Sequence, residues 1–157
     1  MPKDKKKLRV LFVDDNNDLA SQIAEYYTRK LYGGIYEAYS AGPAHDMVDC
    51  DLISVMYQEG EDMRRQTSKD FRDADTLPQD ERYDFVVFLS RKAFDGWSSK
   101  TPWKGCQILK DMGSRSDFKA TDDLELGRCY SEFAASVKKW VEDNVSDPEK
   151  LRSLISA

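Results

Sequence analysis

The chain has 157 residues, of which 40% are hydrophobic and 34% are charged, with a formal net charge of −5. This length fits one domain, and this content of apolar residues argues against an intrinsically disordered chain. The negative net charge excludes a general electrostatic attraction to nucleic acid or to anionic lipid, so we expect neither as a partner.

The start of the chain and its few histidines and cysteines exclude other classes of protein. Residues 1–7 are basic, but the apolar run behind them is too short for a secretory signal. No stretch approaches the roughly 20 apolar residues of a membrane-spanning helix. We therefore expect a cytoplasmic protein in which residues 1–7 form a solvated basic tail. One histidine and three widely spaced cysteines, with no C-x-x-C pair, predict no zinc or multi-histidine site.

The first half of the chain alternates between short apolar runs and amphipathic segments. Residues 8–13 form a short run that is apolar apart from Arg9 and includes two β-branched valines, and they predict a buried strand. From about Asp18 the apolar residues recur at spacings of three and four, which predicts a helix capped by Asn17 or Asp18 and ended by two glycines. Residues 35–39 predict a second strand and residues 48–59 a second helix.

The second half continues the same alternation. Residues 84–89 are apolar after the first and predict a central strand buried on both faces. Residues 106–109 predict a fourth strand, and an apolar stripe over residues 130–141 predicts another helix. We therefore expect a single α/β domain over residues 1–157, with a parallel sheet, helices on both faces and a C-terminal extension at residues 146–157. Ligands of such sheets bind at the carboxyl ends of the strands, here the loop after the first strand.

That loop carries a resemblance to a known family. It reads D-D-N-N-D-L-A-S over residues 14–21 and leads into a helix that contains Ala24-Glu25. It resembles the C-x5-R-S phosphate loop of the low-molecular-weight tyrosine phosphatases and the related thioredoxin-coupled arsenate reductases. Further matches follow in the family's order: S-A-G at 40–42, E-G at 59–60, S-K at 68–69, Y-D-F-V-V at 83–87, and the stretch from Trp103 to Asp111.

The resemblance implies a fold and a set of loop positions. The fold is a four-stranded parallel sheet in the order 2-1-3-4, of the phosphotyrosine protein phosphatase I-like, flavodoxin-like type. Asn17 stands at the family's loop asparagine and Ser21 at its serine. Asn16 replaces the glycine that helps the loop to curl, and asparagine tolerates a positive φ better than most residues, though less well than glycine.

Two departures remove the family's chemistry. Asp14 stands at the nucleophilic cysteine and Ala20 at the arginine that binds the phosphate dianion through a bidentate fork. Asp111 stands at the general acid, but Met112 replaces the proline that follows it. We therefore predict a catalytically inactive relative without a required cofactor, which acts as a binding or regulatory module for a protein partner. The degenerate loop comprises Asp14, Asp15, Asn16, Asn17, Asp18, Leu19, Ala20 and Ser21.

The acidic residues of the loop favour cations over phosphate. Asp14, Asp15 and Asp18 stand where a phosphate dianion would lie, and each close pair of like charges costs roughly 3 kcal/mol at about 5 Å. A helix N-terminus attracts an anion by only about 0.3–1 kcal/mol. The three aspartates therefore predict a weak Mg²⁺ or Ca²⁺ site. The simpler alternative is that Asp15 and Asp18 only stabilise the start of the helix.

An alternative function starts from the pair Asp14-Asp15. An acidic pair after an apolar strand is similar to that of response-regulator receiver domains, where it holds a magnesium ion. This similarity implies a metal-dependent phosphotransfer or receiver-like signalling domain that uses Asp14 and Asp15. Residues 87–90 (VFLS), at the end of the third predicted strand, contain no aspartate that could be phosphorylated.

Two tryptophans are candidates for a recognition surface. Trp97 and Trp103 follow the third predicted strand, on a stretch rich in serine, lysine and glycine. In the resembling fold this part of the chain approaches the rim of the active-site loop, which predicts an exposed patch. The alternative is a small satellite core, which is the commoner fate of tryptophan.

Overall fold

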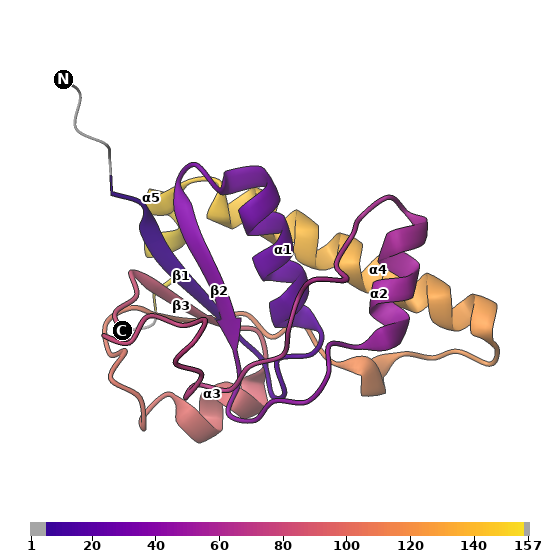
Figure 1. The fold of residues 1–157 in the computed structure, drawn as a ribbon, viewed down its shortest axis with the longest axis horizontal. Coiled ribbons are helices and arrows are strands. Elements are labelled where there is room, and N and C mark those ends of the chain that lie inside the picture. Colours follow the sequence, from indigo (N-terminus) through magenta and orange to yellow (C-terminus); the bar gives the residue numbers. More distant parts are fainter. Residues whose placement is uncertain (1–5, 156–157) are drawn as a thin grey trace.

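A computed structural model describes residues 6–155, and a four-stranded parallel sheet lies at its centre (Figure 1). The strand order is β2-β1-β3-β4, so the predicted order and the parallel pairing are confirmed. Each strand lies within two residues of its predicted bounds. The strands are β1 (Leu8–Val13), β2 (Tyr36–Ala41), β3 (Phe85–Phe88) and β4 (Gln107–Leu109).

Residues 6–155 contain five α-helices. The three predicted helices are present, and α4 begins seven residues before its predicted apolar stripe, whereas α3 and α5 were not predicted. Within residues 6–155 no helix is both long and apolar enough to cross a membrane. The helices are α1 (Ala20–Tyr32), α2 (Cys50–Gln58), α3 (Arg91–Trp97), α4 (Asp123–Trp140) and α5 (Pro148–Arg152), with a short turn η1 (Arg115–Asp117) and a π-helical turn η2 (Val141–Val145).

The central strand β1 separates two apolar cores. Val10 and Phe12 point into the main core, which α1, α2, α4 and α5 complete. Leu11 and Val13 alternate with them and point to the opposite face, which α3 covers. All four side chains are fully buried, which explains why residues 10–13 of this strand are an unbroken apolar run. The carboxyl end of β1, and with it Asp14, therefore lies between two neighbouring strands.

The C-terminal segment is part of the packed domain. Leu151 of α5 is fully buried in the main core, and the Tyr36 hydroxyl of β2 donates a 2.7 Å hydrogen bond to the Val145 carbonyl. The predicted extension at residues 146–157 thus contains a helix that helps to close one face of the sheet. The predicted basic tail at residues 1–7 falls largely outside the described residues, within which Lys6 and Lys7 are exposed.

Tyr36→Phe tests the contribution of that hydrogen bond. The substitution leaves the Val145 carbonyl buried without its donor, so we expect the free energy of unfolding to fall by about 1–2 kcal/mol. Urea unfolding monitored by circular dichroism measures the change. Tyr32→Phe, at the half-buried end of α1, is the control and should leave the unfolding midpoint nearly unchanged. An equal loss in both variants would contradict this role of Tyr36.

Candidate functional site

The candidate site is the loop between β1 and α1, and its centre is the carboxylate of Asp14. Asp14 is only 6% exposed, and its Oδ2 accepts hydrogen bonds from the amides of Ser21 (2.9 Å) and Leu19 (3.3 Å). Amides at the start of a helix are the donors that proteins commonly present to phosphate and other anions. Here a carboxylate from the chain itself takes two of them. The loop is therefore filled from inside by Asp14, the residue that the resemblance aligned with the nucleophile.

This arrangement corrects the predicted cap of α1. The N-cap residue is Leu19, whose side chain cannot accept a hydrogen bond, and neither Asn17 nor Asp18 caps the helix. Asp14 lies five residues before Leu19 in the chain, and the curl of the loop brings its carboxylate back to the helix start. The cap was missed because a local sequence signature places it next to the helix.

Asn17 holds the curl of the loop. Its backbone φ of 51° is the left-handed conformation that was expected at Asn16, and its side chain is fully buried. Asn17 Nδ2 donates to Ser21 Oγ at 2.8 Å, and Asn17 Oδ1 accepts from the Lys69 amide at 2.7 Å. Asn16 is exposed, and its carbonyl accepts from the Ser68 hydroxyl at 2.8 Å. Asn17 therefore adopts the left-handed conformation, and its side chain also bonds Ser21 at the start of α1 and the Lys69 amide.

Gly42 allows β2 to approach this loop. A Cβ at Gly42 would lie 2.5 Å from the Asp14 carbonyl oxygen and 3.1 Å from the Asn17 amide nitrogen. Both contacts are with backbone, which cannot move aside without opening the loop. Glycine is therefore required here by close packing, and this gives a physical reason for the S-A-G match.

A buried polar network behind the loop was not predicted. Glu25 of α1 is 2% exposed; its Oε1 accepts from Ser40 Oγ at 2.9 Å, and its Oε2 accepts from Arg29 Nη2 at 2.9 Å. Lys69 is 6% exposed, and its Nζ lies 3.9 Å from Glu25 Oε1 and donates to the Thr67 carbonyl at 2.8 Å. The resemblance singled out Glu25 and Lys69 by motif but assigned them no role.

Burial is the largest cause of the pKa shifts of Asp14 and Asp18. Burial raises the pKa of the Asp14 carboxyl, although the amide hydrogen bonds oppose the shift, and no described residue bonds its Oδ1. Asp18 is half-buried, and burial together with the charges of Asp14 and Asp49 raises its pKa to about 6. Burial therefore favours the neutral form of the Asp14 and Asp18 carboxyl groups, relative to the same groups in water.

The three aspartates of the predicted cation site point to different partners. Asp14 bonds the helix amides, while Asp15 Oδ1 accepts from the Ser90 hydroxyl at 2.8 Å. Asp18 lies half-buried near Asp49, which caps α2. Within residues 6–155 no three histidine, cysteine or acidic side chains are grouped so that they could hold a metal ion. The predicted weak Mg²⁺ or Ca²⁺ site therefore gains no support from the geometry.

The other positions taken from the family do not assemble an active site either. Ala20 is 2% exposed and packs in the main core, so the position of the arginine is filled by the hydrophobic contact of α1. Asp111 is exposed in the turn after β4, where its carboxylate accepts a hydrogen bond from the Gly113 amide at 3.0 Å.

The predicted recognition surface is corrected for one of its two tryptophans. Trp103 is 6% exposed, and its indole Nε1 donates to the Glu81 carbonyl at 3.0 Å. Phe71 meets Trp97 and Trp103 edge to face, with ring centroids 5.6 and 5.3 Å apart. Trp97 is half-buried against the same cluster. The satellite-core alternative is therefore right for Trp103, because apolar loops cover it on the α3 face of the sheet.

Asp18→Asn tests the titration of the loop. Because the folded-state pKa of Asp18, about 6, lies above its ordinary value of 3.8, ionisation of Asp18 opposes folding as the pH rises from about 4 through about 6. We expect the variant to be more stable than the parent by up to about 1 kcal/mol near pH 7, a figure reduced for solvent screening, and equally stable near pH 4. Urea unfolding at both pH values measures this, with Glu132→Gln on the exposed face of α4 as control. A gain that is independent of pH would contradict the assignment.

No protein-family model and no curated protein sequence matches the chain. Its structure is nevertheless similar to that of a low molecular weight protein tyrosine phosphatase from T. tengcongensis, with a TM-score of 0.63 and 21% identity over 87% of this chain and 99% of that chain. It is also similar to the tyrosine phosphatase Wzb from Escherichia coli K30 in complex with sulphate, with a TM-score of 0.65 and 19% identity over 88% of this chain and 99% of that chain.

A third similar structure is an arsenate reductase in the phosphate binding state. It aligns with a TM-score of 0.60 and 26% identity over 96% of this chain and 100% of that chain. The alignments span nearly the whole of each solved chain, and the strand order 2-1-3-4 agrees with the order that the resemblance implied. The chain therefore has the fold of the low-molecular-weight tyrosine phosphatases and arsenate reductases.

Proposed function

We propose that this protein is a catalytically inactive relative of these enzymes, which acts as a binding or regulatory module. The observation that carries the proposal is the position of the Asp14 carboxylate, which accepts the Leu19 and Ser21 amides at the start of α1. A phosphate dianion would need these donors, and would meet a buried carboxyl group where it had to bind. The loop then serves as a rigid connection between β1 and α1.

The chemistry of phosphoryl transfer has no replacement among the neighbouring residues. A nucleophile must reach the phosphorus atom, but Asp14 is 6% exposed and is held by the helix amides. A cation must neutralise the transferred group, but Ala20 supplies none and lies in the core. Asp111 alone could only donate a proton, to a leaving group that nothing else activates. These three points support an inactive protein.

The alternative, a receiver-like or metal-dependent phosphotransfer domain, finds less support. It requires an accessible aspartate beside ligands for Mg²⁺. Asp14 is buried, Asp15 is bonded to Ser90, and in the described part of the chain no acidic trio converges on a cation position. The strand β3 is followed by Leu89-Ser90, so its end offers no phosphorylatable aspartate.

The first test is hydrolysis of para-nitrophenyl phosphate by the purified full chain. We expect no release of nitrophenol above the rate in buffer, and no reduction of arsenate with thioredoxin and its reductase present. Asp14→Ala is the matched control, because any contaminating phosphatase gives the same rate in both preparations. Turnover that disappears in Asp14→Ala would overturn the proposal. Asp14→Cys with Ala20→Arg should remain inactive, since an arginine at position 20 must displace core packing and Asp18 still repels phosphate.

The second test asks what the loop binds. A ligand that binds the folded state raises the melting temperature once its concentration passes its dissociation constant. We expect inorganic phosphate to give no shift at constant ionic strength, because Asp14 already takes the amides. Mg²⁺ or Ca²⁺ should give at most a small shift, which Asp18→Asn should abolish if the predicted weak site exists. Stabilisation by phosphate would contradict the proposed role of Asp14, and a large shift with Mg²⁺ would favour the phosphotransfer alternative.

A further inference from the structure

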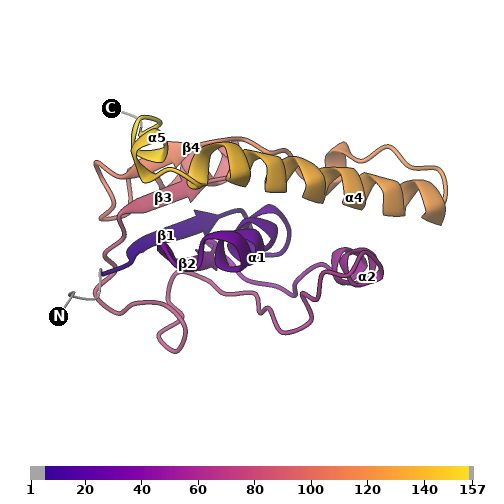
Figure 2. The same ribbon diagram turned by 90° about the horizontal axis from the view of Figure 1, so that it is seen from above.

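A second candidate site lies on the surface between α2 and the N-terminal half of α4. The two helices flank a groove of about 500 Å³. None of the residues that line it belongs to the β1–α1 loop. Figure 2 shows that α4 runs well beyond the sheet, with α2 beside its N-terminal half. Among the α-helices of residues 6–155, α2 is the neighbour that lines this groove with α4, and the groove opens to solvent.

Apolar side chains line part of the groove. Leu124 of α4 lines it and is 79% exposed, the most exposed large hydrophobic side chain among the described residues. Val55 of α2 and Leu126 of α4 also line the groove and are half-buried. A single exposed leucine is common on protein surfaces. Leu124 differs from such a residue because it lines the same groove as Val55 and Leu126.

Gly127 is the least expected residue of the groove. It occupies the fifth position of an 18-residue helix, where glycine destabilises a helix more than any residue except proline. A Cβ at this position would meet only Val55 Cγ2, at an ordinary contact distance of 3.9 Å, so close packing does not require glycine. Its effect is to keep the floor of the groove open between the two helices. Gly96 in α3 also lacks a steric reason, but it lies one residue from the end of a short helix.

The charges around the groove favour a basic occupant. The groove is lined by three carboxylates, those of Asp51, Glu59 and Asp123, and by one guanidinium group, that of Arg128. Asp51 pairs with the Arg115 side chain at 3.2 Å, whereas no ion pair among the described residues involves Glu59 or Asp123. Glu59 is also the C-cap of α2, where the helix dipole disfavours a negative charge. The groove thus retains carboxylates that the fold itself does not neutralise.

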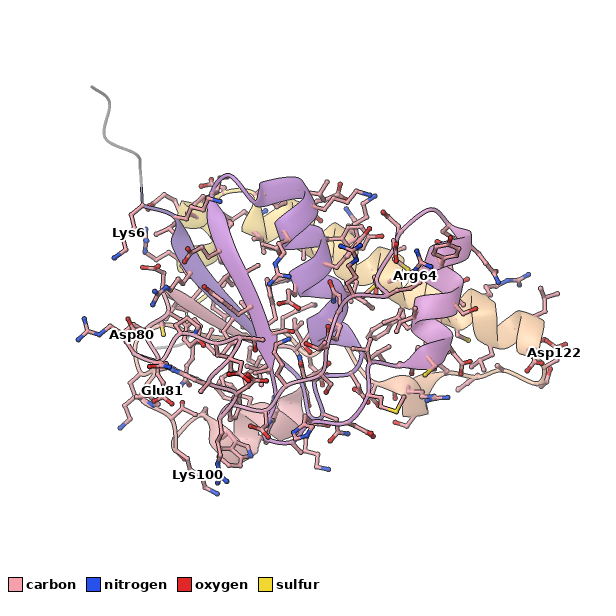
Figure 3. All side chains as sticks on the ribbon, in the orientation of Figure 1. Lys6, Arg64, Asp80, Glu81, Lys100 and Asp122 are labelled. Atoms are coloured by element: carbon pink, nitrogen blue, oxygen red, sulfur yellow. The ribbon has the colours of Figure 1, made fainter. Side chains whose placement is uncertain are left out.

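We propose that the α2–α4 groove binds a basic amphipathic helix of a partner protein, an inference that rests on the proposed binding function and names its surface. An apolar side chain of that helix lies over Gly127 between Val55 and Leu124, and its lysine or arginine residues face Glu59 and Asp123. Lys6 and Asp122 lie at opposite ends of the molecule (Figure 3), and we take the occupant to be a separate protein.

The test uses two synthetic helices with one apolar pattern, one carrying lysine and the other glutamate at every polar position. Each is titrated into the ¹⁵N-labelled full chain. We expect the Lys/Leu helix to shift the amide signals of residues 51–59 and 123–131, and the Glu/Leu helix to leave them in place. Leu124→Ala and Gly127→Leu should each weaken the Lys/Leu complex by roughly fivefold or more. Gly96→Ala is the matched glycine control and should bind like the parent.

Folding is checked with Gly127→Ala, which should raise the melting temperature because its methyl group makes an ordinary contact with Val55. Equal binding of both helices, or signal shifts outside the two segments, would overturn the proposal. A dimer that Leu124→Ala dissociates would overturn it as well, since a second copy would then cover the groove. These outcomes are independent of the hydrolysis of para-nitrophenyl phosphate, so failure of the groove and failure of the inactive-enzyme proposal can be told apart.

Discussion

The structure around the site depends on one hydrogen-bonded contact, in which the Asp14 carboxylate at the end of β1 closes the N-terminus of α1. The start of a helix leaves backbone amides without partners, and they need an acceptor when they are buried. In a phosphate-binding protein the ligand can provide it, but here the chain provides it. The contact therefore replaces a ligand-dependent interaction by a permanent one, at the price of one buried carboxyl oxygen that no described residue bonds.

The neighbouring residues follow from the need to hold this contact. Asn17 adopts a left-handed φ so that the chain can return to Asp14, and its side chain fastens the turn to Ser21 and to the Lys69 amide. Gly42 gives the backbone of Asp14 the space it occupies. A loop with this many internal bonds needs no bound ligand to keep its shape. The packing of the loop is therefore compatible with the proposed role of this protein as a binding module.

The sequence predicted the sheet better than the loop. Apolar runs such as residues 85–88 specify strands by themselves, because burial on both faces admits few polar residues. The cap by Asp14 could not be predicted, because it joins residues that only the tertiary turn brings together. The resemblance singled out Asn17, but a positive φ was expected one position earlier, at Asn16. The helix α3 was missed because its seven residues are too few to show an apolar period.

The buried pair Glu25 and Lys69 has a consequence for how this protein can change through descent. Both side chains are almost inaccessible to water, and Glu25 Oε1 lies 3.9 Å from Lys69 Nζ. Loss of Glu25 would leave the Lys69 ammonium group in the interior without its carboxylate partner, whereas loss of Lys69 would leave Glu25 paired with Arg29 at 2.9 Å. The two positions, 44 residues apart in the chain, are therefore coupled in one direction: a neutral residue at position 25 requires one at position 69, but the reverse does not hold.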